Sequence, residues 1–335
     1  MLYITTRHGD DAYTAYRALT NDVGPDGGGF VPFRLPALST EEILNLKDKT
    51  FNQIVAEILN MFFALRLNGL DLDLIVGKGT ARLVPMNHRI IVAELWHNQN
   101  GSLSCVEQML RNKLAEEAKV DTAAEWSRIA VRIAVFFATY GQLLRDELVS
   151  IGEQIDFSVN NDDFVSVMSI WYCRKMGLPV NMIICTCDEN SNLWDFIHRG
   201  TMSTVGINKQ LQVGIERLLH STVGCNAAEQ FCDACDKGRA YSVSEEELSA
   251  LNSGLFCSVA GRDRAQSVIN SIYRTNSYII DSNAALCYGG LQDYRAKTGA
   301  GGLTVILAEN SPLNQLEEIS VATGLDSSMI KNYIN

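Results

Sequence analysis

The segment from residue 155 to residue 187 constrains the fold more than any other part of the sequence. Two apolar runs, residues 155–159 and 182–187, are too short for buried helices and are bounded by polar residues, which predicts two strands. Residues 164–176 lie between them and are followed by Gly177-Leu178-Pro179, which is typical of a helix end. A strand, a helix and a strand in this order pair the two strands in parallel and place the helix on one sheet face. The sequence therefore predicts an α/β fold, a parallel-sheet sandwich with helices on both faces.

Other segments add helices and strands to this unit. Apolar residues recur at helical spacing in residues 51–67 and again in residues 126–144, which predicts two core helices. Short apolar runs at residues 89–95 and 303–308 predict two further strands. The sheet therefore has at least four expected strands.

The remaining segments are assigned from weaker signals. Ser39 lies three residues before Glu42, a capping-box signature that predicts the start of a helix. We expect a short helix at residues 12–21, between two turn-rich loops. Residues 209–276 have helical patterns with polar interruptions, whereas residues 279–314 are expected to return to short strands and turns. One domain would then be built from discontinuous pieces.

The composition restricts the classes of function. The chain has 335 residues, of which 47% are hydrophobic and 20% charged, as in soluble globular proteins of one large or two ordinary domains. Its formal net charge of -11 disfavours binding to nucleic acid or to anionic lipid. No apolar run reaches the roughly 18–20 residues of a membrane span, and residues 1–10 lack the pattern of a secretory signal. We expect a cytoplasmic protein with no nucleic-acid and no membrane partner.

The nine cysteines are expected to be free thiols, because their odd number and irregular spacing differ from the pattern of disulfide-stapled domains. Cys185 and Cys187 lie two apart in a predicted strand, and we expect them on opposite faces, where they could not chelate one metal together. One further group has the residue types of a zinc site: His220, Cys225, Cys232 and Cys235. Its spacing is not that of a zinc ribbon, so buried thiols are favoured and no metal is expected.

A set of short motifs is spread over nearly the whole chain. The motifs are Tyr3-Ile4-Thr5-Thr6-Arg7, Asp26-Gly27-Gly28-Gly29-Phe30-Val31-Pro32, Leu35-Pro36-Ala37-Leu38-Ser39, Glu94-Leu95-Trp96-His97, Trp126-Ser127-Arg128-Ile129, Phe157-Ser158-Val159, Arg174-Lys175-Met176-Gly177-Leu178-Pro179 and Tyr278-Ile279-Ile280-Asp281-Ser282-Asn283-Ala284-Ala285. In residue type and spacing they resemble the threonine synthase family of fold type II pyridoxal-phosphate enzymes. The resemblance implies the large domain of that fold.

The resemblance is interrupted between His97 and Trp126. The family carries a whole small domain here, whereas this chain has only about thirty residues. We therefore expect a shortened and degenerate member, with the small cofactor domain largely deleted. It would have an N-terminal region at residues 1–95, a short remnant at residues 96–125 and a large α/β domain at residues 126–335. Loss of a packed domain leaves an apolar face, so we expect a homodimer or a protein partner to cover it.

The family's reaction requires a lysine that forms a Schiff base with the cofactor aldehyde. Counted without gaps from residues 94–97, the lysine position falls on Ser104 and the next position on Cys105. Neither side chain can form the imine. Lys113 could replace the lysine, but residues 111–117 have the charge pattern of a solvated helix face. The resemblance thus implies no catalytic residue and no bound pyridoxal phosphate.

The loop that would hold the cofactor phosphate also departs from the family. In the family, a loop containing glycine and asparagine binds phosphate through backbone N–H groups. Here the loop is Asn160-Asn161-Asp162-Asp163, so two carboxylates would face a dianion. At an effective dielectric of about 20, two unit charges about 4 Å apart interact by roughly 4 kcal/mol, which opposes binding. The two aspartates could instead cap the following helix, an interpretation that we favour.

Three residues are candidates for a retained cleft. A histidine at the position of His97 lies next to the cofactor in the family, although a lone histidine is more often structural. Arg128 and Arg132 are one helical turn apart and could hold an anionic ligand by bidentate contacts, but salt bridges to the many carboxylates are favoured.

These features favour a threonine synthase-like pseudoenzyme with a binding or assembly role. Two alternatives stay open. The first is a pyridoxal-phosphate-dependent threonine synthase, or a related lyase, with displaced catalytic residues. The second is a small-molecule binding protein that reuses the cleft.

Overall fold

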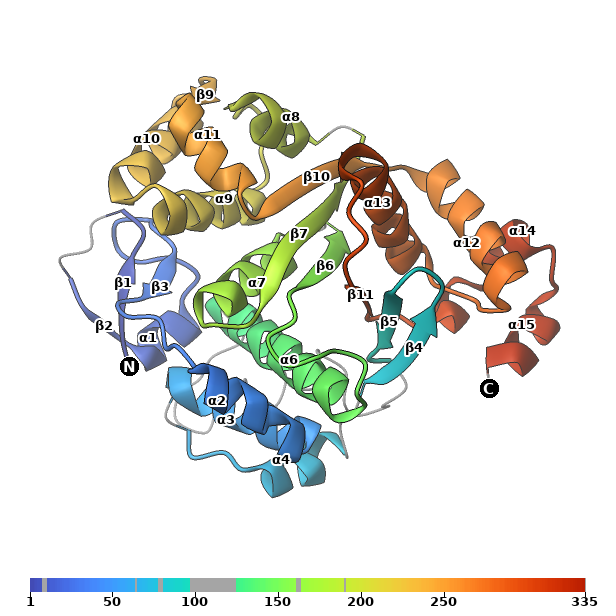
Figure 1. The fold of residues 1–335 in the computed structure, drawn as a ribbon. Coiled ribbons are helices and arrows are strands. Elements are labelled where there is room, and N and C mark those ends of the chain that lie inside the picture. Colours follow the sequence, from blue (N-terminus) through green and yellow to red (C-terminus); the bar gives the residue numbers. More distant parts are fainter. Residues whose placement is uncertain are drawn as a thin grey trace.

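A six-stranded sheet forms the centre of the protein (Figure 1). The computed structural model describes residues 1–7, 11–63, 65–77, 81–96, 125–160, 164–189 and 191–334. In sheet order, the strands are β10 (Leu255–Val259), β7 (Val180–Cys187), β6 (Ile155–Asn160), β11 (Thr304–Ala308), β5 (Ile90–Glu94) and β4 (Arg82–Met86). All neighbours pair in parallel except β4, which is antiparallel to β5 at one edge.

Helices cover both faces of this sheet (Figure 1). The core on one face includes α6 (Glu125–Arg145) and α7 (Val165–Lys175), with α3 (Phe51–Phe63) packed against α6. The other face packs against α12 (Arg262–Asn276), α13 (Ser282–Thr298), α14 (Leu316–Thr323) and α15 (Ser327–Ile334). Because successive side chains on a strand point to opposite faces, Val305 joins the first core and Ile306 the second.

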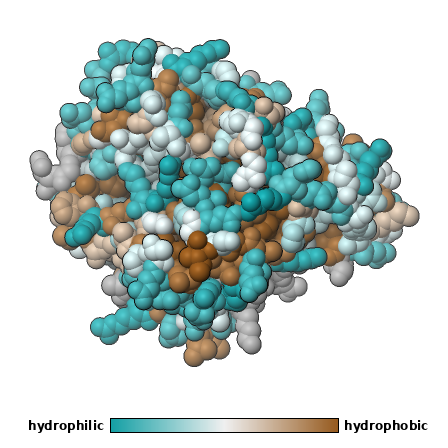
Figure 2. All heavy atoms as spheres, in the orientation of Figure 1, coloured by the Kyte–Doolittle hydropathy of each residue, from teal (hydrophilic) through white to brown (hydrophobic). Residues whose placement is uncertain are grey.

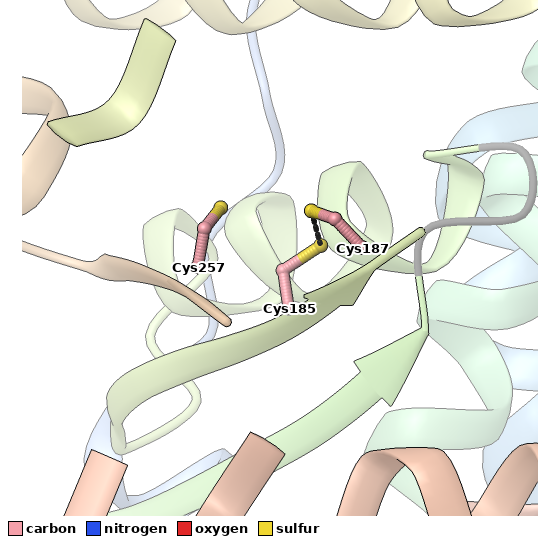
Figure 3. Close-up of side chains that lie close together, drawn as sticks. All are labelled: Cys185, Cys187 and Cys257. Carbon is pink, nitrogen blue, oxygen red and sulfur yellow. Dashed lines mark hydrogen bonds between the residues drawn. The ribbon is translucent and has the colours of Figure 1, made fainter. Parts of the chain in front are cut away.

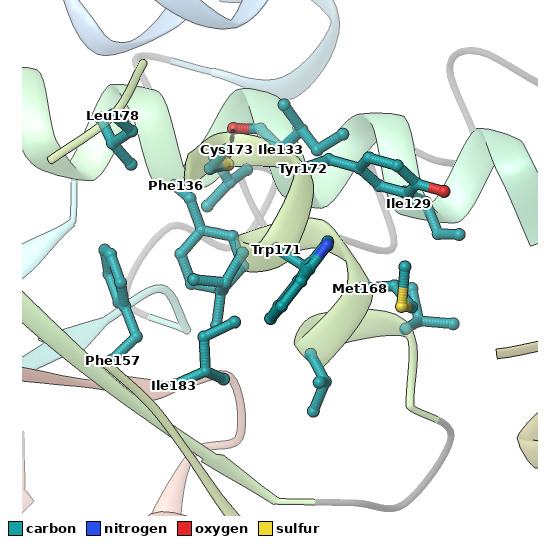
Figure 4. Packing of buried hydrophobic residues seen from close by; sticks show 14 of the residues in the cluster. Ile129, Ile133, Phe136, Phe157, Met168, Trp171, Tyr172, Cys173, Leu178 and Ile183 are labelled. Carbon is teal, nitrogen blue, oxygen red and sulfur yellow. Dashed lines mark hydrogen bonds between the residues drawn. The ribbon is translucent and has the colours of Figure 1, made fainter. Parts of the chain in front are cut away.

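The first core contains several aromatic side chains (Figure 4). Phe136 of α6 meets Phe157 of β6 edge to face, with ring centroids 4.9 Å apart. Near the start of α6, Trp126 is almost fully buried and donates from its indole N–H to the hydroxyl of Tyr3 at 3.1 Å. Such pairs contribute beyond the apolar area that they bury. The pair of Tyr3 and Trp126 connects the N-terminal strand to α6.

The N-terminal region forms a small antiparallel sheet, β2 (Tyr13–Thr14), β1 (Leu2–Thr5) and β3 (Phe30–Pro32), with α1 (Ala15–Thr20) beside it. It contacts α9 (Lys209–Thr222) through buried charges. The hydroxyl of Thr6 and the guanidinium of Arg7 both donate to the carboxylate of Glu216. The next residue, Arg217, is fully buried, and its Nη1 lies 2.7 Å from Glu125 Oε2.

The remaining elements are peripheral. A helical group lies at the upper left of Figure 1: α8 (Asn192–Arg199), α9, α10 (Cys225–Asp236) and α11 (Glu245–Asn252), with the two-stranded sheet of β8 (Thr201–Met202) and β9 (Tyr241–Ser242). At the lower edge are α2 (Thr40–Leu44), the 3-10 helix Asn45–Asp48 and α4 (Gly69–Val76). A second 3-10 helix, Pro312–Gln315, precedes α14.

The βαβ unit predicted from the sequence is confirmed, since β6, α7 and β7 follow one another and the two strands pair in parallel. The capping box of Ser39 and Glu42 is also confirmed at the start of α2. The short helix expected at residues 12–21 begins only at Ala15, because Tyr13 and Thr14 pair with β1. The expected boundaries of the other strands agree with β5 and β11 to within one residue.

Two segment assignments differ from the structure. The first is incomplete: residues 209–276 are rich in helices, as expected, but they also contain the short strand β9 and the edge strand β10. Residues 279–314 consist mainly of α13 rather than of strands and turns. Small residues such as Ala285 and Gly290 allow α13 to pack closely on the sheet, and they weaken the apolar period that would identify a helix.

Gly290 sets the distance between α13 and the sheet. A Cβ atom at this position would lie 2.1 Å from Thr186 Oγ1 on β7. We expect Gly290→Ala to lower the free energy of unfolding by about 1–3 kcal/mol through overpacking, as measured by urea denaturation. The matched control is Gly289→Ala in the same helix, where the added atom would meet the flexible Arg264 side chain at 3.2 Å. Equal effects of the two substitutions would contradict the packing argument.

The visible surface is mostly hydrophilic, with scattered apolar patches (Figure 2). Two apolar side chains of α4, Leu70 and Leu74, are 75% and 87% exposed and lie one helical turn apart. None of the helices in the described ranges has the length and apolar character needed to cross a bilayer.

Candidate functional site

Two neighbouring strands, β6 and β11, end beside a cavity of about 140 Å³. After β6 the chain passes into α7 on one sheet face, whereas β11 is reached from α13 on the other face. In open α/β sheets, ligands bind beyond the carboxyl ends of strands at such a change of side. The polar residues that line the cavity are Arg132, Asn160, Ser166, Asn283, Glu309 and Asn310.

Each of these side chains is held by a regular element. Asn160 is the last residue of β6, Ser166 is in the first turn of α7 and Asn283 is in the first turn of α13. Glu309 directly follows β11. Arg132 projects from the middle of α6 and is 9% exposed, so its guanidinium is held in the protein rather than in water.

Arg132 and Glu309 form an ion pair across the cavity. The distance from Arg132 Nη2 to Glu309 Oε2 is 3.5 Å, longer than the 2.7–2.9 Å of a tight charge-assisted hydrogen bond. The carboxylate side chain is one-third exposed, whereas the guanidinium side chain is 11% exposed. The described lining of the cavity therefore presents one cationic group, one anionic group and several amides.

A buried aspartate lies behind this cavity at the N-cap of α13. Asp281 is 1% exposed and its Oδ1 accepts hydrogen bonds from the backbone N–H groups of Asn283 and Ala284. Burial raises the pKa of Asp281 to about 7, the two backbone hydrogen bonds oppose the shift, and the charge of Glu309 adds to it. Because the ionised form is disfavoured by burial, this carboxyl group changes charge near neutral pH.

The entry to α7 has an unusual backbone. Phe164 precedes the helix with φ 58°, in the left-handed region that is rarely adopted by aromatic residues. Its ring packs closely on α9, where a Cβ added to Gly214 would lie 2.7 Å from the ring. Phe164 provides no side-chain cap for α7. Packing against α9 therefore fixes the direction in which the chain leaves the cavity.

The residues expected from the sequence are only partly brought together. Arg132 and Asn160 line the cavity, but Arg128, one turn earlier on α6, does not. His97, Ser104, Cys105, Lys113, Asn161, Asp162 and Asp163 lie outside the described residues. The sequence reasoning missed Glu309 and Asn283. Glu309 could have been found as the first polar residue after a predicted parallel strand.

The described lining does not fit a Schiff-base-linked cofactor. No lysine is among the described residues that line the cavity, so none of them could form an imine. The carboxylate of Glu309 would also lie near any bound phosphate. The volume of about 140 Å³ is below the roughly 300–1,000 Å³ of pockets for drug-sized ligands.

The cysteines are arranged differently from the expectation. Cys185 and Cys187 share one face of β7, so the prediction of opposite faces is wrong: side chains alternate along a strand, and residues two apart lie on the same side. In the described part of the chain, one group of three possible metal ligands lies close together, and it contains Cys185, Cys187 and Cys257. The group around Cys232 and Cys235 forms no such cluster.

Comparison with known proteins shows similarity to threonine synthases. The family model of the threonine synthase N terminus matches residues 2–79. A threonine synthase of Pseudomonas aeruginosa is 21% identical over 395 aligned positions, which cover 85% of this chain and 83% of that protein. Over most of its length, this chain is thus similar in sequence to a threonine synthase.

Other threonine synthase-like proteins match a smaller share of this chain. Human "Threonine synthase-like 1" is 20% identical over 173 residues, which cover 48% of this chain. The match spans only 23% of that longer protein. The matched part of this chain therefore spans about a quarter of the length of this relative.

Solved structures agree with the fold. The PLP-bound threonine synthase from Brucella melitensis superposes with a TM-score of 0.82 at 16% identity, over 97% of this chain and 92% of the other. The yeast threonine synthase gives a TM-score of 0.77 at 14% identity, over 96% and 89%. The mostly parallel sheet with helices on both faces is thus the fold of the threonine synthases.

Proposed function

We propose that this protein does not carry out a lysine-dependent reaction and instead binds a small zwitterionic ligand, such as a short α-amino acid, between β6 and β11. The observation that carries the proposal is the pair of opposite charges, Arg132 and Glu309, on the lining of one cavity. A guanidinium binds a carboxylate in bidentate geometry, and a carboxylate accepts from an ammonium group. An amino acid offers both partners a few bonds apart.

The distance between the two charged groups is compatible with a ligand that binds between them. At 3.5 Å, the contact between Arg132 and Glu309 is longer than a tight hydrogen bond, and a zwitterion inserted between them would replace this ion pair with two. Asn160, Asn283 and Asn310 supply amide donors and acceptors for a polar side chain. The volume of about 140 Å³ favours a ligand with few heavy atoms over a cofactor.

The sequence supports the absence of the family reaction. The position of the family lysine falls on Ser104 when counted from residues 94–97, and a hydroxyl cannot form the imine. The described lining of the cavity contains no lysine that could replace it. Two independent observations therefore favour a protein that binds without catalysing this chemistry.

Titration with pyridoxal phosphate tests the catalytic part of the proposal. We expect no imine absorbance band and, after borohydride reduction, no cofactor adduct in the intact-mass spectrum, because no amine is placed at the site. The threonine synthase of Pseudomonas aeruginosa, treated in parallel, serves as the positive control. An adduct on one lysine of the folded chain at stoichiometric cofactor would overturn the proposal.

Calorimetric titration with glycine, serine and threonine tests the binding part. We expect one ligand per chain for at least one of them, and binding about 10- to 100-fold weaker in Arg132→Met, because a hydrogen bond to a charged group contributes roughly 1.5–3 kcal/mol. The matched control is Arg128→Met, which removes a guanidinium one turn away that does not line the cavity. Equal losses in both variants, or no heat with any amino acid, would count against this site.

A further inference from the structure

Three cysteines meet on one face of the sheet, away from the cavity between β6 and β11. Cys185 and Cys187 belong to β7, and Cys257 belongs to the neighbouring strand β10, where it pairs directly with Cys185. Their sulfur atoms all lie within 4.8 Å of one another, and those of Cys185 and Cys187 are 4.0 Å apart. Figure 3 shows that the three side chains project to the same side of the two strands.

The cluster is fully enclosed by the protein. Cys185, Cys187 and Cys257 are each at most 1% exposed. Cys173, another fully buried cysteine, differs because its thiol is satisfied by the backbone carbonyl of Ile133 at 3.7 Å. A core uses isolated cysteines as small apolar residues and needs no group of three thiols. Their convergence therefore calls for a specific explanation.

The spacing of the sulfur atoms matches the coordination sphere of one ion. With metal–sulfur bonds of about 2.3 Å, three sulfurs in a plane around an ion are about 4.0 Å apart. The distance between Cys185 and Cys187 already has this value, and the largest separation in the cluster requires a shift of less than about 1 Å. Small side-chain rotations are sufficient to close the site.

The number of protein ligands distinguishes between the metals that thiolates can bind. Structural zinc sites are four-coordinate, and iron–sulfur clusters are held by four protein ligands. Across the described ranges, no histidine, cysteine, aspartate or glutamate joins the three cysteines as a fourth ligand. Thiolates select soft ions, and Cu(I) is the soft ion that accepts three sulfurs in a plane. We propose that Cys185, Cys187 and Cys257 form a three-coordinate Cu(I) site.

Binding exchanges protons for the ion. Three thiols and one Cu(I) give a tris-thiolate complex with two negative charges and three released protons, with no change in oxidation state. The affinity therefore rises with pH.

The test is an anaerobic titration of the fully reduced chain with Cu(I), followed by exposure to a chelator and metal analysis. We expect one tightly held ion per chain and an X-ray absorption spectrum with three sulfurs at about 2.3 Å. Binding to Cys187→Ala and Cys257→Ala is expected to be at least 100-fold weaker. Circular dichroism of these variants establishes that each is folded.

Two controls separate this site from other thiols. Cys173→Ala, at a fully buried position outside the cluster, should retain the ion. The triple variant Cys225→Ala, Cys232→Ala and Cys235→Ala should also retain it, because those thiols form no cluster. Loss of the ion in either control, removal of all copper by the chelator, or preferential retention of Zn(II) would overturn the proposal. So would a disulfide among the three cysteines in the protein purified without reductant.

Discussion

Replacement of Arg217 by methionine is expected to lower the free energy of unfolding by about 3–5 kcal/mol. The arginine side chain is fully buried, its Nη1 lies 2.7 Å from Glu125 Oε2, and its Nε donates to the carbonyl of Phe30. Methionine fills much of the space but leaves the carboxylate of Glu125 in the interior without its cation. Urea denaturation at neutral pH, followed by circular dichroism, measures the loss.

Two variants locate the origin of this loss. Arg199→Met removes one partner of an exposed ion pair with Asp195 and is expected to cost at most about 1 kcal/mol. The double variant Glu125→Gln and Arg217→Met removes the stranded charge and should recover part of the stability. If Arg217→Met alone were as mild as Arg199→Met, the buried pair would not hold α9, α6 and β3 together.

Asp281→Asn is expected to change the pH dependence of stability. The pKa of Asp281 is raised to about 7 by burial, so the folded chain binds more protons than the unfolded chain between about pH 4 and pH 7. Its contribution is therefore most favourable below pH 4 and is lost as the pH rises to 7. Over this window, the wild-type chain should lose about 4 kcal/mol relative to the asparagine variant.

Asparagine keeps the side-chain oxygen that caps α13 and removes only the titration. The two proteins should thus have similar stability at pH 4, and the variant should be the more stable one at pH 8. Denaturation curves at one-unit pH intervals provide the comparison. A difference between the two proteins that does not vary with pH would show that Asp281 is not held neutral by its surroundings.

Strong periodicity made much of the fold predictable. The regular apolar spacing in residues 126–144 identified α6, and the two apolar runs around residues 164–176 identified the βαβ unit. The helix α13 was not predicted, because its contact with the sheet is made by small residues such as Gly290. Such residues do not produce the apolar periodicity that identifies a helix. The strand β10 was not predicted either, because a mainly apolar run of five residues between two helices is difficult to distinguish from part of a helix.

Of the candidate site, only residues whose type and position in a predicted element already indicated a role could be predicted from the sequence. Arg132 was identified as a cation on a core helix, and it lies at the cavity. Its partner Glu309 is 177 residues later in the chain, and only the pairing of β11 with β6 brings the two together. The cysteine cluster depends in the same way on the pairing of β10 with β7.

The attachment of the N-terminal strand to α9 has a consequence for biosynthesis. Thr6 and its acceptor Glu216 are 210 positions apart. At about 5–20 residues per second, the ribosome needs roughly 10–40 s to make the chain between them. The strands β1, β2 and β3 can pair with one another early, but until α9 is made Thr6, Arg7 and Phe30 lack the partners that this helix supplies. Newly made molecules of this protein thus have a long interval in which this part of the N-terminal sheet is open to association with other chains.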